Sequence, residues 1–426
     1  MIKNRVKHSF ISKLFLWIVK AVGDVIFSFR NHSVRSKVFF LTDYDNAVFF
    51  GYHDKTPFSS DNSRILAMSV KASDQRADSE CTSMKLGYFE KDASGRFCNK
   101  FIPFSETTTW GWQQGCMLQW NPSDPDNEVV FNKLIDGKYG AVIFNLKTKQ
   151  NIKKFDMPVY SVSSDGKFAV TLNFSRLGRL RPGYGYRLLP DKTNDQDAPR
   201  DDGLFLMDLN SGEKFLLLNL ADLADEISRK NCQHYVNHAT FSPDGKRIVF
   251  FHLWVDQAEN RNMRFLCYNL ESKCIEKIEI KDKVSHYCWH SDSKILATVQ
   301  SGKINNWQFF FYTLNEKNVW EKTPAFVGMN TDGHPMKSPV EEEMFVSDSR
   351  LNRFREDQVV LFNPYNYKTL KVARFVIPFQ YNGIVRCDLH PRWDREGRYV
   401  VVDTIKKGKR AMAVIEIEDN QKKLIK

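Results

Sequence analysis

Seven short segments of this chain share one pattern. Each begins with a short apolar strand, turns through residues rich in Ser, Pro, Asp, Asn or Gly, and continues into a second apolar strand, as in NHATFSPDGKRIVFF and HPRWDREGRYVVVD. Each segment aligns on one residue: Phe58, Trp120, Val162, Phe241, Trp289, Lys337 and Trp393. Further strand candidates, such as AVIFNLKT and RAMAVIEIED, follow the segments. The pattern indicates one supersecondary unit used repeatedly along the chain.

The repeat predicts an all-β protein, a seven-bladed β-propeller with four-stranded antiparallel blades. A four-stranded blade needs roughly 40 to 50 residues, so seven blades fill residues 36–426. The strand KVFFLTD at 37–43 is the candidate that completes the last blade and closes the ring. Counts of six or eight blades stay open, because the Lys337 segment lacks an aromatic alignment residue.

Residues 1–35 form a separate N-terminal segment. Apolar residues recur at helical spacing within SFISKLFLWIVKAVGDVIFSF (9–29), and basic residues crowd the front of this stretch. The pattern predicts an amphipathic helix that precedes the propeller and lies on a membrane surface; the alternative is a helix packed against the main domain. Lys13, Lys20 and Asp24 argue against a transmembrane span, and no small-residue cleavage motif follows the stretch.

Composition restricts the partners and the compartment. The 426 residues carry a formal net charge of +11 and have a pI near 9.1, which favours polyanionic partners or reflects a generally basic surface. No nucleic-acid-binding signature, Walker loop or GxSxG elbow accompanies this charge, so nucleic acid is not expected as a partner. The eight cysteines are scattered and contain no CxxC pair. This usage indicates reduced thiols and a cytoplasmic protein, peripheral to the membrane if residues 9–29 bind it.

Four histidines occupy one position in consecutive repeats. His238, His286, His334 and His390 each stand three residues before the alignment residue. In a propeller, the starts of the innermost strands face one mouth of the central channel, so we expect these imidazoles to converge. Convergent neutral imidazoles suit a divalent transition metal. The alternative is that each histidine only starts an inner strand and bonds to a neighbouring blade.

A second group of candidate residues lies at 158–191, in PVYSVSSDGKFAVTLNFSRLGRLRPGYGYRLLPD. Arg176, Arg179 and Arg181 offer forked guanidinium groups for carboxylates, and Tyr160 and Tyr184 offer flat rings and hydroxyls. This combination favours a site for an anionic sugar. The alternative is an ordinary inner-strand tyrosine followed by a solvated basic loop.

Three of these features resemble known propeller families. The SPDG-type turns look like those of TolB-like propellers. The order of histidine-led repeats is similar to that of the seven-bladed oligogalacturonate lyases. The segment from Tyr160 to Arg176 resembles the corresponding tyrosine and arginine of the ulvan lyase propellers. These resemblances extend over roughly residues 45–420 as a repeat pattern.

The resemblance to oligogalacturonate lyases implies a divalent metal, because those enzymes hold one through histidines of the later repeats. Carried over by motif, SHYCW offers His286 and DLHPRW offers His390. Asp388 stands where that family has another histidine, and His334 in DGHPMK is a further candidate ligand. The metal implied is manganese-like or zinc.

A lyase that acts on a uronic acid removes the proton next to the carboxylate, whose negative charge must be neutralised. The sequence offers His238 as the base, Tyr160 as base or proton donor, and Arg176 as the neutralising group. The 16-residue gap between Tyr160 and Arg176 matches the ulvan lyases. Those enzymes also use two histidines of early blades, where this chain has Gln113 and Gln114 in WGWQQG.

His53, in GYHDKTPF, is the candidate that substitutes for those histidines or binds substrate. The candidate substrate-binding residues are His53, Gln114, Arg179, Arg181 and Tyr184. Two functions follow from these residues. One is a lyase-like propeller that binds and cleaves an acidic, uronate-containing oligo- or polysaccharide, in polysaccharide metabolism or surface-glycan production. The other is a non-catalytic propeller that binds an acidic glycan or scaffolds proteins, since this fold serves many functions.

Overall fold

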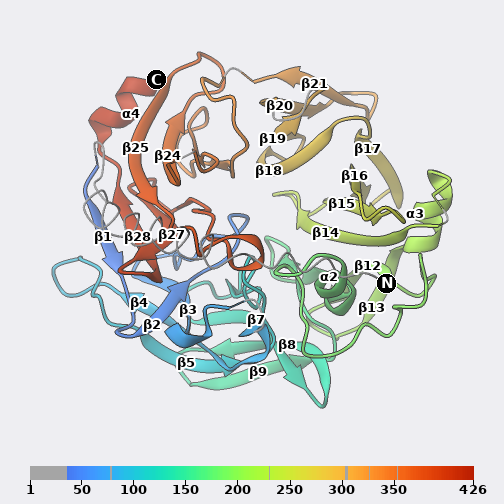
Figure 1. Cartoon of the computed structure of the whole chain (residues 1–426), viewed down its shortest axis with the longest axis horizontal. Coiled ribbons are helices and arrows are strands. Elements are labelled where there is room, and N and C mark those ends of the chain that lie inside the picture. Colours follow the sequence, from blue (N-terminus) through green and yellow to red (C-terminus); the bar gives the residue numbers. More distant parts are fainter. Residues whose placement is uncertain (1–35, 77–78, 230, 303–305, 326, 353) are drawn as a thin grey trace, which may run out of the picture.

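The computed structural model describes residues 36–426 except 77–78, 230, 303–305, 326 and 353. The predicted amphipathic helix at 9–29 therefore lies outside the described residues. Seven four-stranded antiparallel sheets stand around a central axis (Figure 1), which confirms the seven-bladed prediction and excludes six or eight blades. In the described part of the chain, no helix is long and apolar enough to cross a membrane.

The blades follow one another along the chain, each from its innermost strand outward. Blades one to three comprise β2 (Asn46–Phe49), β3 (Arg64–Lys71), β4 (Met84–Glu90) and β5 (Ile102–Thr107); β6 (Gln119–Trp120), β7 (Glu128–Ile135), β8 (Lys138–Asn145) and β9 (Gln150–Phe155); and β10 (Ser161–Val162), β11 (Phe168–Thr171), β12 (Gly203–Asp208) and β13 (Lys214–Asn219). Blades four and five comprise β14 (Gln233–Phe241), β15 (Arg247–Val255), β16 (Arg261–Asn269) and β17 (Cys274–Glu279); and β18 (Lys283–Ser291), β19 (Lys294–Gln300), β20 (Trp307–Leu314) and β21 (Trp320–Pro324). Blades six and seven comprise β22 (Met336–Lys337), β23 (Phe345–Asp348), β24 (Glu356–Phe362) and β25 (Thr369–Val376); and β26 (Arg392–Trp393), β27 (Tyr399–Lys406), β28 (Lys409–Glu416) and β1 (Val38–Leu41).

The ring closes through its N-terminal strand, as expected from KVFFLTD. β1 is the outermost strand of the last blade and pairs antiparallel with β28, from Val38 opposite Ile415 to Leu41 opposite Met412. The first and last segments of the described chain therefore share one sheet. This pairing links the two ends of the propeller, since the other blades are continuous in sequence.

The seven alignment residues all occupy one position in their blades, opposite the start of the next strand. The pairs are Phe58 with Ile65, Trp120 with Val129, Val162 with Ala169, Phe241 with Ile248, Trp289 with Ile295, Lys337 with Phe345 and Trp393 with Val400. Lys337 fits this register although it is not aromatic. The residues just before these positions therefore face equivalent places around the ring.

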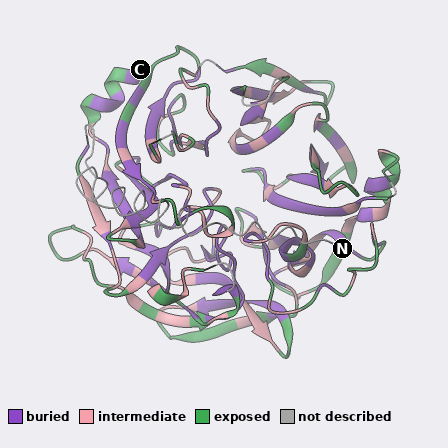
Figure 2. Cartoon of the chain, viewed as in Figure 1, coloured by how far each residue is buried: buried purple, intermediate pink, exposed green. Residues whose placement is uncertain are grey.

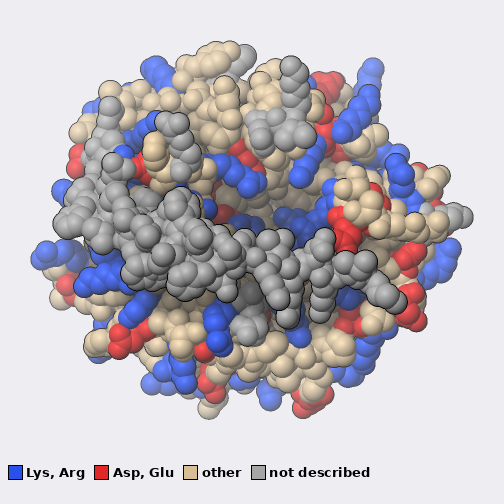
Figure 3. All heavy atoms as spheres, in the orientation of Figure 1, with Lys and Arg blue, Asp and Glu red and all other residues tan. Residues whose placement is uncertain are grey.

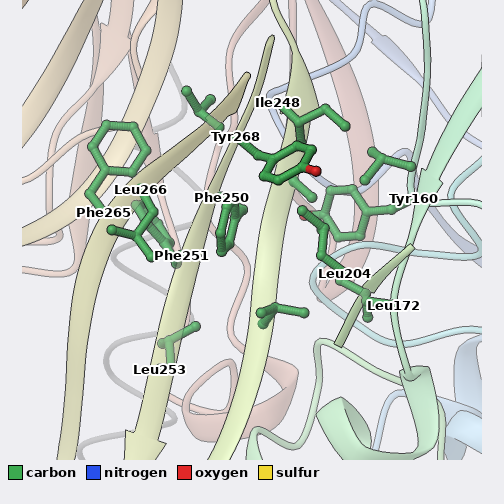
Figure 4. Close-up of a cluster of buried hydrophobic side chains, with 14 of the residues drawn as sticks. Tyr160, Leu172, Leu204, Ile248, Phe250, Phe251, Leu253, Phe265, Leu266 and Tyr268 are labelled. Atoms are coloured by element: carbon green, nitrogen blue, oxygen red, sulfur yellow. The ribbon is translucent and has the colours of Figure 1, made fainter. Parts of the chain in front are cut away.

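The middle strands of the blades are buried on both faces, because each sheet packs between two neighbours, whereas outer strands such as β9 and β13 are largely exposed (Figure 2). In β15, the consecutive residues Ile248, Val249, Phe250 and Phe251 are all at most 2 % exposed. The hydrophobic cluster in Figure 4 joins β15 and β16 to Tyr160 and other apolar residues of blade three. Continuous apolar runs therefore mark the middle strands of the blades, and an alternating pattern is not required.

Short helices lie in the connections. The three α-helices of the described chain are α2 (Phe174–Leu180), α3 (Leu220–Glu226) and α4 (Asp419–Ile425), and the 3₁₀ turns are η1 (Ala72–Asp74), η2 (Ser79–Cys81) and η3 (Gly383–Val385). The side chain of Asn173 caps α2 by accepting from the backbone N–H of Arg176. α2 and the chain that follows it separate β11 from β12. This connection accounts for the long interval between the third and fourth repeats.

The innermost strand of blade one is interrupted. β2 pairs with the far part of β3 as far as Phe49, and Phe58 pairs with Ile65 near the other end. Between these points residues 50–57 leave the sheet; we call them the insert. The ring of Tyr52 lies 4.6 Å from the ring of His238 and 5.1 Å from that of His390, measured between centroids. The insert therefore reaches the histidines of the later blades.

A buried ion pair of the last blade fixes the insert. Arg392 and Asp403 are at most 2 % exposed, and their charged groups lie 2.9 Å apart. The Asp403 carboxylate also accepts the backbone N–H groups of Phe50 and Gly51, each at 3.0 Å. Gly51 has a φ of 111°, and a Cβ there would lie 3.0 Å from the backbone of the facing loop. Glycine therefore permits both this conformation and this close approach.

Candidate functional site

Five histidines meet in the central channel: His53 from the insert, and His238, His286, His334 and His390 from the repeats. Their exposed fractions are at most 8 %. The ring of His334 is the most central, with centroid distances of 3.9 Å to His286, 4.3 Å to His390 and 5.1 Å to His53. Histidines that lie far apart in the sequence thus come together, because the ring of blades places equivalent inner-strand positions around one axis.

Three of the four predicted metal ligands form one group. Ligand atoms of His334, Asp388 and His390 all lie within 4.8 Å of one another. Nδ1 of His334 hydrogen-bonds to the Asp348 carboxylate at 2.8 Å, and Nε2 of His390 is buried without a hydrogen-bond partner among the described residues. Two imidazole nitrogens and a carboxylate are a donor set that a divalent metal accepts, and a carboxylate behind a ligand histidine is the usual supporting contact. The residues therefore fit a divalent cation.

His286, the fourth predicted ligand, is not part of this three-residue group. Its Nδ1 lies 3.1 Å from Oδ1 of Asp332, whose other oxygen pairs with the guanidinium of Arg350. Burial and the neighbouring His334 lower the pKa of His286 to about 4. His286 is therefore a neutral imidazole at the edge of the group.

Neighbouring charges and burial shift the pKa values of the three group members in different directions. Burial by itself would lower the pKa of His334, but the Asp348 carboxylate raises it above its ordinary value. Burial, with His334 next to it, keeps the pKa of His390 well below its ordinary value. The Asp388 carboxylate accepts from Nε of Arg386 at 2.8 Å, and this contact outweighs burial and lowers the pKa of Asp388. His390 and Asp388 are thus in the neutral and ionised forms in which they ligate a metal.

A cavity of about 710 Å³ opens beside the histidine and aspartate group. Its walls come from the chain after α2, the starts of blades five and six, the β23–β24 connection and the chain before blade seven. The arginines that line it are Arg181, Arg261, Arg350, Arg355 and Arg386, and the carboxylates are Asp332, Asp348, Asp357 and Asp388. Figure 3 shows basic side chains around the central hollow of the face that it presents.

Three of the cavity arginines, Arg181, Arg261 and Arg355, form no ion pair with a carboxylate of the described residues, and Arg181 is the one that lies against an aromatic ring of the cavity wall. Arg350 pairs with Asp332 and Arg386 pairs with Asp388, whereas no carboxylate of the described residues forms an ion pair with Arg181. Instead, its guanidinium lies over the ring of Tyr184, 4.1 Å from the centroid. A partly buried guanidinium without an anionic partner is a binding place for a ligand carboxylate.

Tyr184 lines the same cavity between two arginines. Its hydroxyl oxygen accepts from Nη2 of Arg386 at 2.5 Å. Burial by itself would raise the pKa of this phenol, but the guanidinium groups of Arg386 and Arg181 lower it to about 8. The predicted substrate-binding residues Arg181 and Tyr184 are therefore neighbours at the cavity wall.

The other part of the predicted site lies deeper in the channel. The Gln114 amide donates to the Tyr160 hydroxyl at 2.6 Å, and Nδ1 of His238 lies 3.4 Å from that hydroxyl and 3.5 Å from the amide nitrogen. Burial and the nearby Arg181 keep the pKa of His238 well below its ordinary value. The structure thus brings Gln114, Tyr160 and His238 together, but none of them lines the cavity. Tyr184 lies between this deeper group and the cavity: its ring is 5.7 Å from the ring of His238, and its side chain lines the cavity wall.

His53, predicted to bind substrate, also lies inside the channel and not at the cavity wall. It is 2 % exposed, and its Nδ1 has no hydrogen-bond partner among the described residues. Burial, with the nearby histidines, keeps its pKa well below the ordinary value. His53 is therefore a neutral imidazole that the insert holds against the metal-ligand candidates.

Arg176 and Arg179, predicted to neutralise and to bind the substrate, lie away from the cavity and from the channel histidines. Arg176 is 1 % exposed, and its N–H groups donate to backbone carbonyls, among them those of His234 at 2.6 Å and Asp197 at 2.6 Å. Arg179 donates to the buried Asp191 at 2.9 Å. Both side chains fasten the chain between α2 and β14, so neither guanidinium is turned to the cavity.

Sequence reasoning missed several residues that shape the site. Arg386 and Asp348 were not candidates, and neither was Asp332, although the pair Asp332-Gly333-His334 and Asp388-Leu389-His390 repeats the motif D-x-H. That repetition was a usable signal. Asp348 gave none, because it reaches His334 from the next strand of the blade.

Gln113 has a role that its position in the sequence did not suggest. Its side-chain amide donates to the backbone carbonyls of Ile384 at 2.9 Å and Arg386 at 3.0 Å. The glutamine that stands where the ulvan lyases have a histidine thus holds the chain that carries Arg386. The amide of Gln113 serves here as a hydrogen-bond donor to the backbone and cannot act as a general base.

Comparison with known proteins gives a likeness of fold. No protein-family profile and no curated protein sequence matches the chain. Among solved structures, an oligogalacturonate lyase in complex with manganese superimposes with a TM-score of 0.63 at 15 % identity, covering 92 % of this chain and 97 % of that one. An oligogalacturonate lyase from Vibrio parahaemolyticus gives a TM-score of 0.61 at 12 % identity, covering 92 % and 99 %. The remote resemblance seen in the repeats thus extends over nearly the whole propeller.

Proposed function

We propose that this propeller binds an acidic, uronate-containing oligosaccharide in the cavity and cleaves it by β-elimination. The observation that carries the proposal is the place of Arg181, a guanidinium without an acidic partner that shares one cavity with His334 and Asp388. An anchor for a carboxylate and a candidate metal group thus face the same space. The likeness of fold to two oligogalacturonate lyases supports the same class of substrate.

The chemistry explains why an arginine is needed there. Removing the proton next to a carboxylate adds negative charge to a group that is already an anion, and a cation fixed beside it lowers the barrier. Arg181 is therefore the proposed group that neutralises the substrate carboxylate, the role that the sequence pattern suggested for Arg176. The Arg181 guanidinium lies over the ring of Tyr184, 4.1 Å from its centroid, and this contact holds the anchor in place before substrate arrives.

We propose His334, Asp388 and His390 as the residues that hold a divalent metal. When bound there, the cation supplies Lewis-acid stabilisation of charge on a substrate oxygen. Manganese is the metal we favour over zinc, because a carboxylate replaces a histidine in the set and harder oxygen donors suit manganese better. The manganese bound by one structural neighbour supports this choice.

A binding-only function has one observation in its favour. His238, the base predicted from the sequence, is 2 % exposed and does not line the cavity. A propeller that kept the anion site without a base in contact with substrate would bind an acidic glycan and leave it intact. Assaying binding and cleavage on the same samples separates the two functions.

The experiment is to incubate the full chain with a panel of uronate oligosaccharides, with and without manganese or zinc. Binding is measured by calorimetry, and cleavage by the ultraviolet absorbance of the unsaturated product. We expect Arg181→Met to weaken binding by about 10- to 100-fold, because a charge-assisted hydrogen bond contributes roughly 1.5 to 3 kcal/mol. Arg200→Met, which removes an arginine that is 72 % exposed, is the control and should bind normally.

The outcomes distinguish the lyase from the binding module and test the position of the carboxylate anchor. Cleavage of any uronate supports the lyase. Binding without cleavage supports the binding module, and no binding to any member of the panel refutes the acidic-glycan proposal. Equal binding by Arg181→Met and the Arg200→Met control would show that the anchor has been placed wrongly.

A further inference from the structure

We infer that Tyr184 is the residue that removes the proton in the proposed elimination. The inference rests on the proposed function and names a catalytic group that neither the repeats nor the paired Tyr160 and Arg176 pointed to. Its basis is position: Tyr184 is the side chain that lies against the anchor for the substrate carboxylate and is itself part of the cavity wall.

The geometry ties the proton to this tyrosine. The carbon that loses the proton is bonded directly to the carboxylate carbon. If Arg181 holds that carboxylate, the reacting carbon is bonded directly to the anchored carboxylate carbon. The ring of Tyr184 lies against the same guanidinium, and its hydroxyl is within reach of both Arg181 and Arg386, which line the cavity. No other phenol is in cation–π contact with Arg181 in the described part of the chain. Proximity of this kind is the first requirement for a general base.

The hydroxyl is also prepared for the task. Arg386 donates to its oxygen at 2.5 Å, and a donor aimed at a phenol oxygen stabilises the phenolate. Arg386 is itself held by Asp388, by a hydrogen bond at 2.8 Å. The charged groups that act on Tyr184 are two guanidiniums, Arg386 and Arg181, and one carboxylate, Asp388. The other titratable groups that face it are Tyr52, Tyr160, Tyr235 and His238; burial raises the pKa of the three phenols and lowers that of the imidazole, so all four are neutral near neutral pH. The two guanidiniums lower the pKa of Tyr184 more than burial and Asp388 raise it. The resulting pKa of about 8 leaves a useful fraction of phenolate near neutral pH.

The competing bases are less well placed. His238 is enclosed by Tyr52, Tyr160 and Tyr184 and does not reach the cavity wall. His286 does line the cavity. Its pKa of about 4 makes it a far weaker base than a phenolate, and proton abstraction from carbon favours the stronger base.

The elimination balances as follows. The Tyr184 phenolate takes the proton from the carbon next to the carboxylate, and the electron pair of that C–H bond forms the new carbon–carbon double bond. The bond from the neighbouring carbon to the glycosidic oxygen breaks, and its electron pair leaves with the oxygen. Water protonates that oxygen, and Tyr184 returns its proton to the solvent. The products are one unsaturated uronate end and one free hydroxyl.

The test compares Tyr184→Phe with Tyr44→Phe in the full chain. Tyr44 is 94 % exposed and does not line the cavity, so the same loss of a phenol hydroxyl there serves as the control. With the uronate oligosaccharide that the wild-type protein cleaves best, we expect Tyr184→Phe to lose at least about 100-fold in kcat while oligosaccharide binding changes by less than about threefold. Tyr44→Phe should keep the wild-type kcat.

A pH profile gives a second readout that a merely structural tyrosine would not move. In the wild-type protein, kcat/KM should rise with pH through an apparent pKa near 8, and the residual activity of Tyr184→Phe should lack this limb. Retained cleavage in Tyr184→Phe, or a loss confined to His238→Gln or His286→Gln, would overturn the inference and leave the lyase proposal intact. Absence of cleavage by the wild-type protein would overturn both.

Discussion

Arg176 lies within α2 and Arg181 caps the end of that helix, yet their side chains meet different surroundings. Arg176 points into the protein and is satisfied by backbone carbonyls, whereas Arg181 lies at the cavity wall over an aromatic ring. Two arginines close in sequence thus separate into one that fastens backbone carbonyls and one that lines the cavity. The direction in which each side chain leaves this short helix decides the difference.

Arg176→Met should therefore destabilise the fold. The substitution leaves several buried carbonyls without their donor, and each such group costs about 1 to 3 kcal/mol, so we expect the free energy of unfolding to fall by at least about 3 kcal/mol. Urea denaturation of the full chain measures it. Arg200→Met, at the surface, should change stability by less than about 0.5 kcal/mol. A similarly small change in Arg176→Met would contradict the structural role.

Substitution of Asp348, the carboxylate bonded to His334, tests the proposed metal site more sharply than removal of one of the proposed ligands His334, Asp388 and His390. Asp348 accepts from the ring and from the backbone N–H of His334, and from the backbone N–H of His390. Asp348→Asn should weaken manganese or zinc binding by about 10- to 100-fold, the usual effect of losing such a supporting carboxylate. Isothermal calorimetry or competition with a chelator measures it. Asp165→Asn, in an exposed turn, is the control and should leave the affinity unchanged.

At the scale of elements, the insert and the 3₁₀ turn η2 show how connections hold the channel. The insert takes Tyr52 and His53 out of blade one and into the histidine group, and it is fixed by the buried pair of Arg392 and Asp403. In η2, the buried Glu80 accepts the backbone N–H of Trp112 at 3.1 Å. That contact supports the loop that carries Gln113 and, through it, the chain of Arg386.

Glu80 should make stability depend on pH. Burial raises the pKa of Glu80 from 4.5 to about 7 in the folded protein. The unfolded carboxyl then ionises at lower pH than the folded one, so the stability from this group is full below about pH 4.5 and is lost as pH rises to about 7. The loss is about 3 kcal/mol. Glu80→Gln keeps an acceptor for Trp112 and should remove this part of the slope.

Urea denaturation of both proteins at several pH values measures the effect. The difference in the free energy of unfolding, wild type minus Glu80→Gln, should decrease between about pH 4.5 and 7 and be constant above that range. A pH-independent difference would show that Glu80 titrates normally in the folded state.

At the scale of the whole molecule, the propeller is a closed ring whose centre is made by all its parts. β1 and β28 bring the first and last described segments into one sheet, and the central histidines come from blades one, four, five, six and seven. A ligand bound at the centre therefore stabilises contacts among several blades at once. Binding and global stability should be linked.

Addition of manganese should raise the thermal unfolding midpoint, and a chelator should return it to the metal-free value. At a free metal concentration of 100 times Kd, the stabilisation is about 2.7 kcal/mol. Differential scanning calorimetry checks this, with magnesium at the same concentration as the control, because imidazole ligands favour transition metals. The double variant His334→Ala, His390→Ala should show no response to manganese. A response that persists in this variant would place the metal elsewhere.

The repeat by itself determined the all-β propeller fold, the strand order within a blade and the closing strand; it favoured seven blades, and the structure excluded six or eight. These follow from local pattern, because an apolar run, a polar turn and another apolar run make a hairpin wherever they occur, and seven hairpins with their outer strands fill a ring. The sequence also determined that His286, His334 and His390 would meet, since equivalent positions in a closed ring face one axis. Only the tertiary structure decided which residues form the site. It turned Arg176 inward and Arg181 outward, broke the first inner strand to deliver His53, and brought Asp348 and Arg386 to partners that no spacing in the chain could reveal. Such choices depend on the direction of individual side chains and on contacts between distant blades, and a one-dimensional pattern carries neither.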